Sequence, residues 1–132
     1  MNNLEDFYKK LEIKNIEIKN IVIVVAIIVL LASMYFNKND IKNLSGKKPY
    51  MSDGAAKKLD LGIAVMALII VLVTLYLNYN DYCIEKAMGR DLTSSLLKII
   101  AYTISIIPVS ILIYIATTDP EDDMLTGVSA MI

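Results

Sequence analysis

Three long runs without a charged residue constrain the fold of this chain more than any other feature of its sequence. They cover residues 20–37, 61–80 and 99–118, and each is bounded on both sides by Asp or Lys. As α-helices, the runs would be roughly 27–30 Å long at 1.5 Å per residue, which matches a hydrocarbon core of about 30 Å. The sequence therefore predicts three transmembrane helices.

Two other folds fit this pattern less well. Helices of a soluble bundle carry a polar face at a period of 3.6 residues, and none of the three runs does. A transmembrane barrel needs segments that alternate between polar and apolar residues, and only helices and closed barrels satisfy their backbone in lipid. We therefore expect an all-α integral membrane protein with three transmembrane helices and an N-terminal amphipathic helical extension.

The extension is residues 1–19, where apolar side chains recur at helical spacing. We interpret one helical face as a candidate partner-docking face, made of Leu4, Phe7, Tyr8 and Leu11. Such a segment is typical of an interfacial helix or of a helix that docks on a partner. The alternative is that it extends the first transmembrane helix into water, and the sequence does not decide between the two.

A tandem pentapeptide joins this extension to the first run, with Glu-Ile-Lys-Asn-Ile at residues 12–16 and again at residues 17–21. Its isoleucines predict an apolar contact face that continues towards the membrane, formed by Ile13, Ile16, Ile18 and Ile21. Two copies are too few for a repeat architecture.

Residues 38–60 are expected to form a polar, lysine-rich loop that carries six lysines and three acids. Gly46 and Pro49 favour a turn there. Ser52 is the expected N-cap of a helix that leads into the second run, because its hydroxyl can accept from a backbone amide of the first turn.

The second transmembrane helix is expected to continue past its run to about residue 88, with Gly89 as its stop. Asp91 or Thr93 would cap the third helix, so residues 81–98 form a short connection and the last two spans pack as a hairpin. Aromatic rings are favoured at the level of the lipid headgroups. We therefore expect a membrane interface marked by Tyr76, Tyr79 and Tyr82.

Pro108 lies in the middle of the third run and predicts a helix kink, because proline removes one backbone hydrogen bond. Ser105 and Ser110 are near enough in sequence to satisfy the freed carbonyl groups. Such a kink can mark a gate, although it is more often structural.

The segment 119–132 begins as an acidic C-terminal tail with a typical helix start: an Asp cap, Pro120 and acids in the first turn. The helix-start acidic cluster is Asp119, Glu121, Asp122 and Asp123. Its spacing resembles the opening of an EF-hand loop, but Met124 and Ala130 occupy the positions that require Gly and Glu. We expect no metal site and no cofactor.

The composition argues against several classes of function. Histidine is absent, cysteine occurs once, and the net charge is −1. These values favour neither a nucleic-acid partner nor a disulfide framework. The runs hold no ionisable residue of the kind that marks proton relays and ion paths, and a serine nucleophile there would have no base. We therefore expect a protein that is not an enzyme.

The preferred hypothesis is a structural or assembly subunit of a larger membrane-associated complex, with the lipid bilayer and other membrane or coat proteins, or a homo-oligomer, as partners. Abundant Lys, Ile and Asn are typical of an AT-rich genome, which permits a viral inner-membrane or capsid-anchoring protein. The choice between a cell membrane and the inner membrane of a virion stays open. The alternatives are a holin-like permeabilising protein and a small oligomeric transporter. Seven basic residues on one side against six on the other leave the orientation open.

Overall fold

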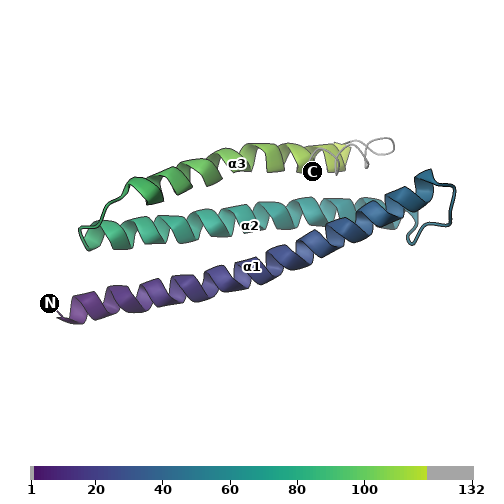
Figure 1. The fold of residues 1–132 in the computed structure, drawn as a ribbon. Helices are drawn as coiled ribbons and strands as arrows, with labels where there is room; N and C mark the ends of the chain where they lie inside the picture. Colours follow the sequence, from purple (N-terminus) through teal and green to yellow (C-terminus); the bar gives the residue numbers. More distant parts are fainter. Residues whose placement is uncertain (1, 119–132) are drawn as a thin grey trace.

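The structure is a computed structural model that describes residues 2–118, and these residues form three antiparallel α-helices (Figure 1). Helix α1 comprises Asn2–Leu44, α2 Asp53–Ala87 and α3 Thr93–Thr118. Each helix is long and apolar enough to cross a membrane. No strand occurs between residues 2 and 118. The predicted all-α fold with three transmembrane helices is confirmed.

Helix α2 is the middle element of the fold. It packs against α1 on one side and against α3 on the other, as Figure 1 shows. Within the described part of the chain, the backbones of α1 and α3 do not approach each other. The expected hairpin of the second and third spans is therefore present, and within the described residues the backbone of α1 packs against this hairpin along α2.

Two glycines end the first two helices in the same way. Gly46 and Gly89 adopt φ values of +73° and +71°, in the left-handed region that side chains with a Cβ rarely occupy. In both cases the amide that follows the glycine donates to the carbonyl five residues earlier, at 2.9 Å. This pair of features is a Schellman motif. The prediction that Gly89 stops the second helix is confirmed.

The first connection is shorter than the expected loop 38–60, since only residues 45–52 lie outside helices. In the second connection, residues 88–92 lie outside helices, as expected for a second helix that continues to about residue 88. A charge ends an apolar run but not a helix, because lysine and glutamate are good helix formers in water. The helices end instead at their caps. Ser52 is one of them, as predicted, and its hydroxyl accepts from the amide of Ala55 at 3.2 Å.

The N-terminal segment belongs to α1, which runs without a break from Asn2 to Leu44. A helix that lies in the plane of the membrane surface would need a bend near residue 20, where the first run begins. The expected N-terminal helical extension is present, and its described part continues the first transmembrane helix, which was one of the two interpretations left open. The segment extends the first transmembrane helix by about 27 Å at 1.5 Å per residue.

The best-buried apolar contact lies between α1 and α2, near the loop that joins them. Phe36 is fully buried there against Ala56 and Ile63. Beside it, the rings of Tyr35 and Tyr50 stack with their centroids 5.2 Å apart. Most other large side chains of α1 and α3 are exposed, as expected for helices that face lipid.

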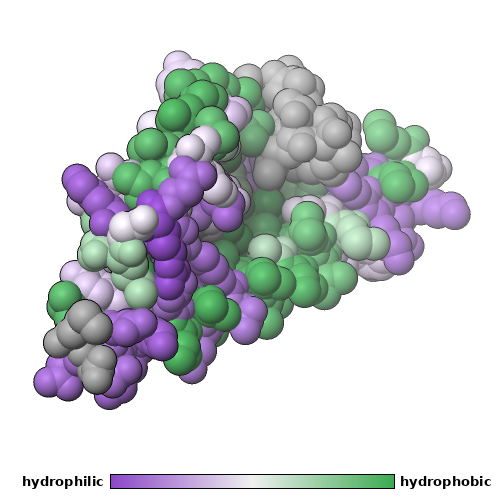
Figure 2. All heavy atoms as spheres, turned by 60° about the vertical axis from the view of Figure 1, so that its left-hand side comes forward, coloured by the Kyte–Doolittle hydropathy of each residue, from purple (hydrophilic) through white to green (hydrophobic). Residues whose placement is uncertain are grey.

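The borders of the uncharged runs lie at matching levels. Lys19, directly before the first run, pairs with Asp81, directly after the second, at 2.5 Å. At the other end, Asp40 of α1 interacts electrostatically with Asp60 of α2. In Figure 2, hydrophobic side chains accordingly occupy the middle of the molecule and hydrophilic ones gather towards its ends. The helices are thus in register for a single apolar slab.

The structure leaves two predictions from the sequence untested, the acidic cluster and the kink at Pro108. The acidic cluster of residues 119–123 lies outside the described residues. Pro108 stands inside α3, which continues through it as one helix. Its kink stays a prediction.

We expect a thiol-labelling experiment to place the two connections on opposite sides of the membrane. Cys83 is exposed in the final turns of α2, so a membrane-impermeant maleimide should label it from one side of sealed vesicles only. Ser45→Cys on a Cys83→Ser background should be labelled from the other side, because one span separates the two positions. Labelling of both thiols from the same side would contradict the predicted topology.

Candidate functional site

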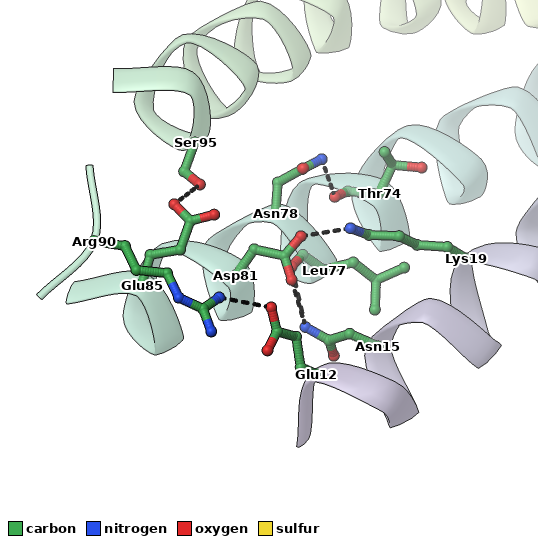
Figure 3. A network of polar contacts seen from close by, with 10 residues as sticks. All are labelled: Glu12, Asn15, Lys19, Thr74, Leu77, Asn78, Asp81, Glu85, Arg90 and Ser95. Carbon is green, nitrogen blue, oxygen red and sulfur yellow. Dashed lines mark hydrogen bonds and ion pairs between the residues drawn. The ribbon is translucent and has the colours of Figure 1, made fainter. Parts of the chain in front are cut away.

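Polar side chains of α1 and α2 meet at the end of the bundle where the N-terminus lies (Figure 3). Asp81 is their centre. Its Oδ1 accepts from Nδ2 of Asn15 at 3.1 Å, and its Oδ2 accepts from Nζ of Lys19 at 2.5 Å. Asn15 is 5% exposed and also donates to the backbone carbonyl of Leu77 at 3.5 Å. Both carboxylate oxygens are therefore satisfied at the border of the apolar slab.

This cluster corrects the predicted contact face of the pentapeptide. Ile13, Ile16 and Ile21 are each more than half exposed and Ile18 is half-buried, whereas Asn15 is buried and contacts α2. The hydrogen bonds to the hairpin come from the polar residues Glu12, Asn15 and Lys19, which are three and four positions apart. A buried polar group needs a hydrogen-bond partner, so the face of α1 that carries Asn15 and Lys19 turns towards Asp81.

Two further contacts lie at the same end of the bundle. One joins the α2–α3 turn to α1, and the other joins α2 to α3. Arg90 in the turn donates to Oε1 of Glu12 on α1 at 2.8 Å. Ser95 of α3 donates to Oε2 of Glu85 on α2 at 2.6 Å. Figure 3 shows these residues beside the Asp81 cluster. All three helices are thus linked by side-chain hydrogen bonds at this one end.

A groove opens beside this cluster, between α1 and α3. Its volume is about 350 Å³, and α2 forms its floor with Thr74, Leu77 and Asn78. The α1 wall runs from Lys19 to Ala26. Lys98 and Tyr102 line it from α3. All three helices therefore take part in this groove.

The opposite end of the α1–α2 contact holds a buried acidic pair. Asp40 is 8% exposed and Asp60 is 6% exposed. Next to them, Asn39 is fully buried and its Oδ1 accepts from the amide of Met51 at 3.0 Å. Its Nδ2 has no hydrogen-bond partner.

Burial raises the pKa of both carboxyl groups. For Asp60, loss of hydration and then the nearby charge of Asp40 raise the pKa to about 6. For Asp40, burial alone raises the pKa. The pair therefore takes up a proton more readily than an exposed aspartate does.

The predicted interface tyrosines lie along one stretch of α2 on both sides of the border marked by Asp81. Tyr76 and Tyr79 are 62% and 55% exposed, and Tyr82 is half-buried. They do not join the Asp81 cluster through hydrogen bonds. Their role as membrane-interface anchors stays a prediction.

Of the predicted docking face, Leu4 and Phe7 are more than half exposed, Leu11 is 36% exposed and Tyr8 is half-buried. The rings of Phe7 and Tyr8 meet edge to face at 5.5 Å. No residue of α2 or α3 covers Leu4 or Phe7 in the described structure. The face is available for a partner.

The two serines near Pro108 do not donate to the carbonyl that the proline frees. Ser105 donates to the carbonyl of Ala101 at 2.8 Å, one turn earlier in the same helix. Proline at position 108 frees the carbonyl of residue 104, four positions before it. The prediction that Ser105 satisfies this carbonyl is therefore wrong, because a serine hydroxyl in a helix reaches its own preceding turn first. Ser110 forms no such bond within residues 2–118.

Across residues 2–118, no group of three or more His, Cys, Asp or Glu side chains converges as a metal ion would require. The arrangement offers two polar clusters at the ends of an apolar slab and one groove that begins at the first of them. These features suit helix packing and the binding of amphipathic molecules.

Comparison of the chain with protein-family models, with curated proteins and with solved structures found no match in any of the three.

Asn15, Lys19, Asp81 and the acidic pair escaped the sequence analysis as interacting groups. A signal for them exists in the sequence. Charged residues at equal distances from the borders of antiparallel runs meet when the helices pack in register, as Lys19 and Asp81 do. The burial of Asn15 is harder to predict from the sequence, since Asn20 holds the same place in the second pentapeptide and is exposed.

We expect the Lys19–Asp81 pair to stabilise the fold more than the Arg90–Glu12 pair. Its carboxylate side chain is 18% exposed, compared with 33% for Glu12, so water screens it less. A double-mutant cycle with Lys19→Gln and Asp81→Asn should give a coupling free energy of about 1 kcal/mol in detergent micelles. The matched cycle with Glu12→Gln and Arg90→Gln should give a smaller, more salt-sensitive coupling. Equal couplings would contradict this ranking.

We also expect Asp60 to make the fold less stable as the pH rises. Between its ordinary pKa of 3.8 and its folded pKa of about 6, the native state holds a proton that the unfolded state has lost. The free energy of unfolding therefore falls across this window and levels off above it. Asp60→Asn should remove most of the slope in a thermal unfolding series from pH 4 to 7. Asp91→Asn is the control: hydrogen bonds from Thr93 lower the pKa of Asp91, so its contribution changes below the window.

Proposed function

We propose that the protein is a non-enzymatic structural or assembly subunit of a larger membrane-associated complex. The observation that supports this most is the apolar docking face of α1, on a helix that extends about 27 Å beyond the first run. An exposed apolar stripe on a rigid helix outside the hydrocarbon core is a typical helix-docking surface.

The direction of this stripe supports the same proposal. At 100° per residue, Leu4, Tyr8 and Leu11 lie on the side of α1 that also carries Asn15, which contacts α2. Figure 1 shows that α1 diverges from α2 towards its N-terminus. The apolar side chains therefore face the side of the hairpin without being covered by it. A partner helix could pack against α1 there.

The α1 extension is also held in place. Glu12, Asn15 and Lys19 bind Arg90 and Asp81 on the hairpin, so the docking face keeps a fixed position relative to the membrane. A preordered surface loses less conformational entropy on binding than a mobile one. This favours a scaffold over a flexible tether.

The partners we propose are other membrane or coat proteins, or further copies of this chain. We propose that this complex lies in a cell membrane or in the inner membrane of a virion. In either case α1 would present its docking face on the same side as the α2–α3 turn, because Glu12 pairs with Arg90.

The test is purification from native membranes in mild detergent after crosslinking, with mass spectrometry of the products. We expect defined partner proteins or a defined oligomer of the chain. Phe7→Glu should reduce the crosslinked yield at least tenfold, because it places a charge in the apolar contact, at a cost of 1.4 kcal/mol or more.

Lys9→Gln is the matched control. It changes the net charge by the same amount, and Lys9 lies on the opposite side of α1, about 200° from Phe7. Its only recorded contact among the described residues is a long ion pair with Glu5 at 3.9 Å. Equal losses for both variants, or a monomer without co-purifying proteins, would contradict the proposal.

Two other functions fit parts of the structure. A holin-like permeabilising protein matches the small size and the three spans, and a small oligomeric transporter matches the groove with Thr74 and Asn78 in its floor. Expression in bacteria separates the first, since abrupt loss of membrane potential would favour it. Flux into proteoliposomes separates the second. Unchanged growth and no flux would leave the structural subunit as the proposal.

A further inference from the structure

The groove between α1 and α3 changes character along its length. One end is polar and lies at the border of the uncharged runs, where Lys19 and Lys98 directly precede the first and third run. The other end reaches Ala26 on α1 and Thr74 on α2, roughly 10 Å deeper at 1.5 Å per residue. Val22 and Ile23 form the apolar wall between them. The groove thus crosses from the headgroup level into the hydrocarbon.

The charges at its mouth do not cancel. Lys19 is neutralised by Asp81, which holds its ammonium group at 2.5 Å (Figure 3). Lys98 is exposed and takes part in no hydrogen bond or ion pair of residues 2–118. The mouth of the groove therefore carries one uncompensated positive charge.

The hydrogen-bond donors point to the same end. Thr74 donates to the carbonyl of Ile70 at 2.7 Å, and Asn78 donates to the carbonyl of Thr74 at 2.8 Å. The hydroxyl donor of Thr74 and one of the two amide hydrogens of Asn78 are thus occupied within α2. Lys98 and the hydroxyl of Tyr102, one turn deeper on α3, offer unoccupied donors along the groove.

The dimensions favour a narrow ligand over a protein helix. One turn of an α-helix with a diameter of 10 Å occupies about 420 Å³. The groove measures about 350 Å³ over some two turns, which is less than the volume of one helical turn, so its size fits a thinner ligand better. An acyl chain is thinner. The groove is also open to the side on which lipid covers α1 and α3, because these two helices do not close over α2.

We propose that this groove binds one phospholipid with an anionic headgroup. The phosphate lies at Lys98 and Tyr102, and one acyl chain follows Val22, Ile23 and Ala26 over the floor of α2. Charge complementarity selects an anionic lipid over a zwitterionic one, and the apolar wall selects a lipid over a soluble phosphate. The lipid fills the space between α1 and α3, which each pack against α2 but not against each other in the described residues.

The test is native mass spectrometry of the full chain in detergent, titrated with dioleoyl phosphatidylglycerol or dioleoyl phosphatidylcholine. We expect one bound phosphatidylglycerol per chain at concentrations where phosphatidylcholine does not bind. Lys98→Gln should weaken phosphatidylglycerol binding about fivefold, the factor for about 1 kcal/mol per lysine near an anionic headgroup.

Lys86→Gln is the matched control for charge. It removes the same charge near the same end of the bundle, but Lys86 does not line the groove. It should leave binding unchanged. Equal losses for Lys86→Gln and Lys98→Gln would mean a diffuse electrostatic attraction and would overturn the proposal. Circular dichroism of each variant establishes that its helices are intact.

A second variant tests the acyl chain. Ala26→Leu fills the deep end of the groove far from any charge and should weaken phosphatidylglycerol binding at least as much as Lys98→Gln does. Soluble glycerol 3-phosphate should not compete. Full binding by Ala26→Leu, together with competition by glycerol 3-phosphate, would assign the site to a free phosphate and overturn the lipid. Neither result depends on a partner protein, so the proposed function and this inference fail separately.

Discussion

The exclusion of charge from a slab about 30 Å thick is the constraint on which the rest of this structure depends. Each helix contributes one uncharged run, and the runs are stacked so that their borders coincide. The coincidence brings charges of different helices together at the same level. Lys19 meets Asp81 at one border, and Asp40 meets Asp60 at the other. The polar contacts are thus a consequence of the register.

The two borders use charge differently. At one, opposite charges and Asn15 satisfy each other, so burial costs little and the contact fixes the rotation of α1 about its axis. At the other, two acids are buried together, and burial raises the pKa of both. The apolar packing of Phe36 lies beside this second border and offsets its cost. The fold is therefore pinned by polar contacts at one end and by apolar packing at the other.

The sequence was sufficient for what depends on composition and local chemistry. The three spans, the Ser52 cap and the Gly89 stop all follow from short stretches of chain, and the structure has them. The contact face of α1 could not be found in this way. In the membrane, an isoleucine side chain is as stable against lipid as against another helix. Apolar periodicity therefore does not reveal which side of α1 packs against α2. The end of the first helix at residue 44 was also missed, since the border of an apolar run was taken for the end of a helix.

The central position of α2 has a consequence for how the chain assembles. The helices that pack together are also neighbours in the sequence, and the contact between Lys19 and Asp81 joins residues that are 62 positions apart. When α2 enters the membrane, α1 is already there to receive it, and α3 then meets a surface that is complete. Such a chain can acquire its structure stepwise, in the order in which a ribosome delivers it.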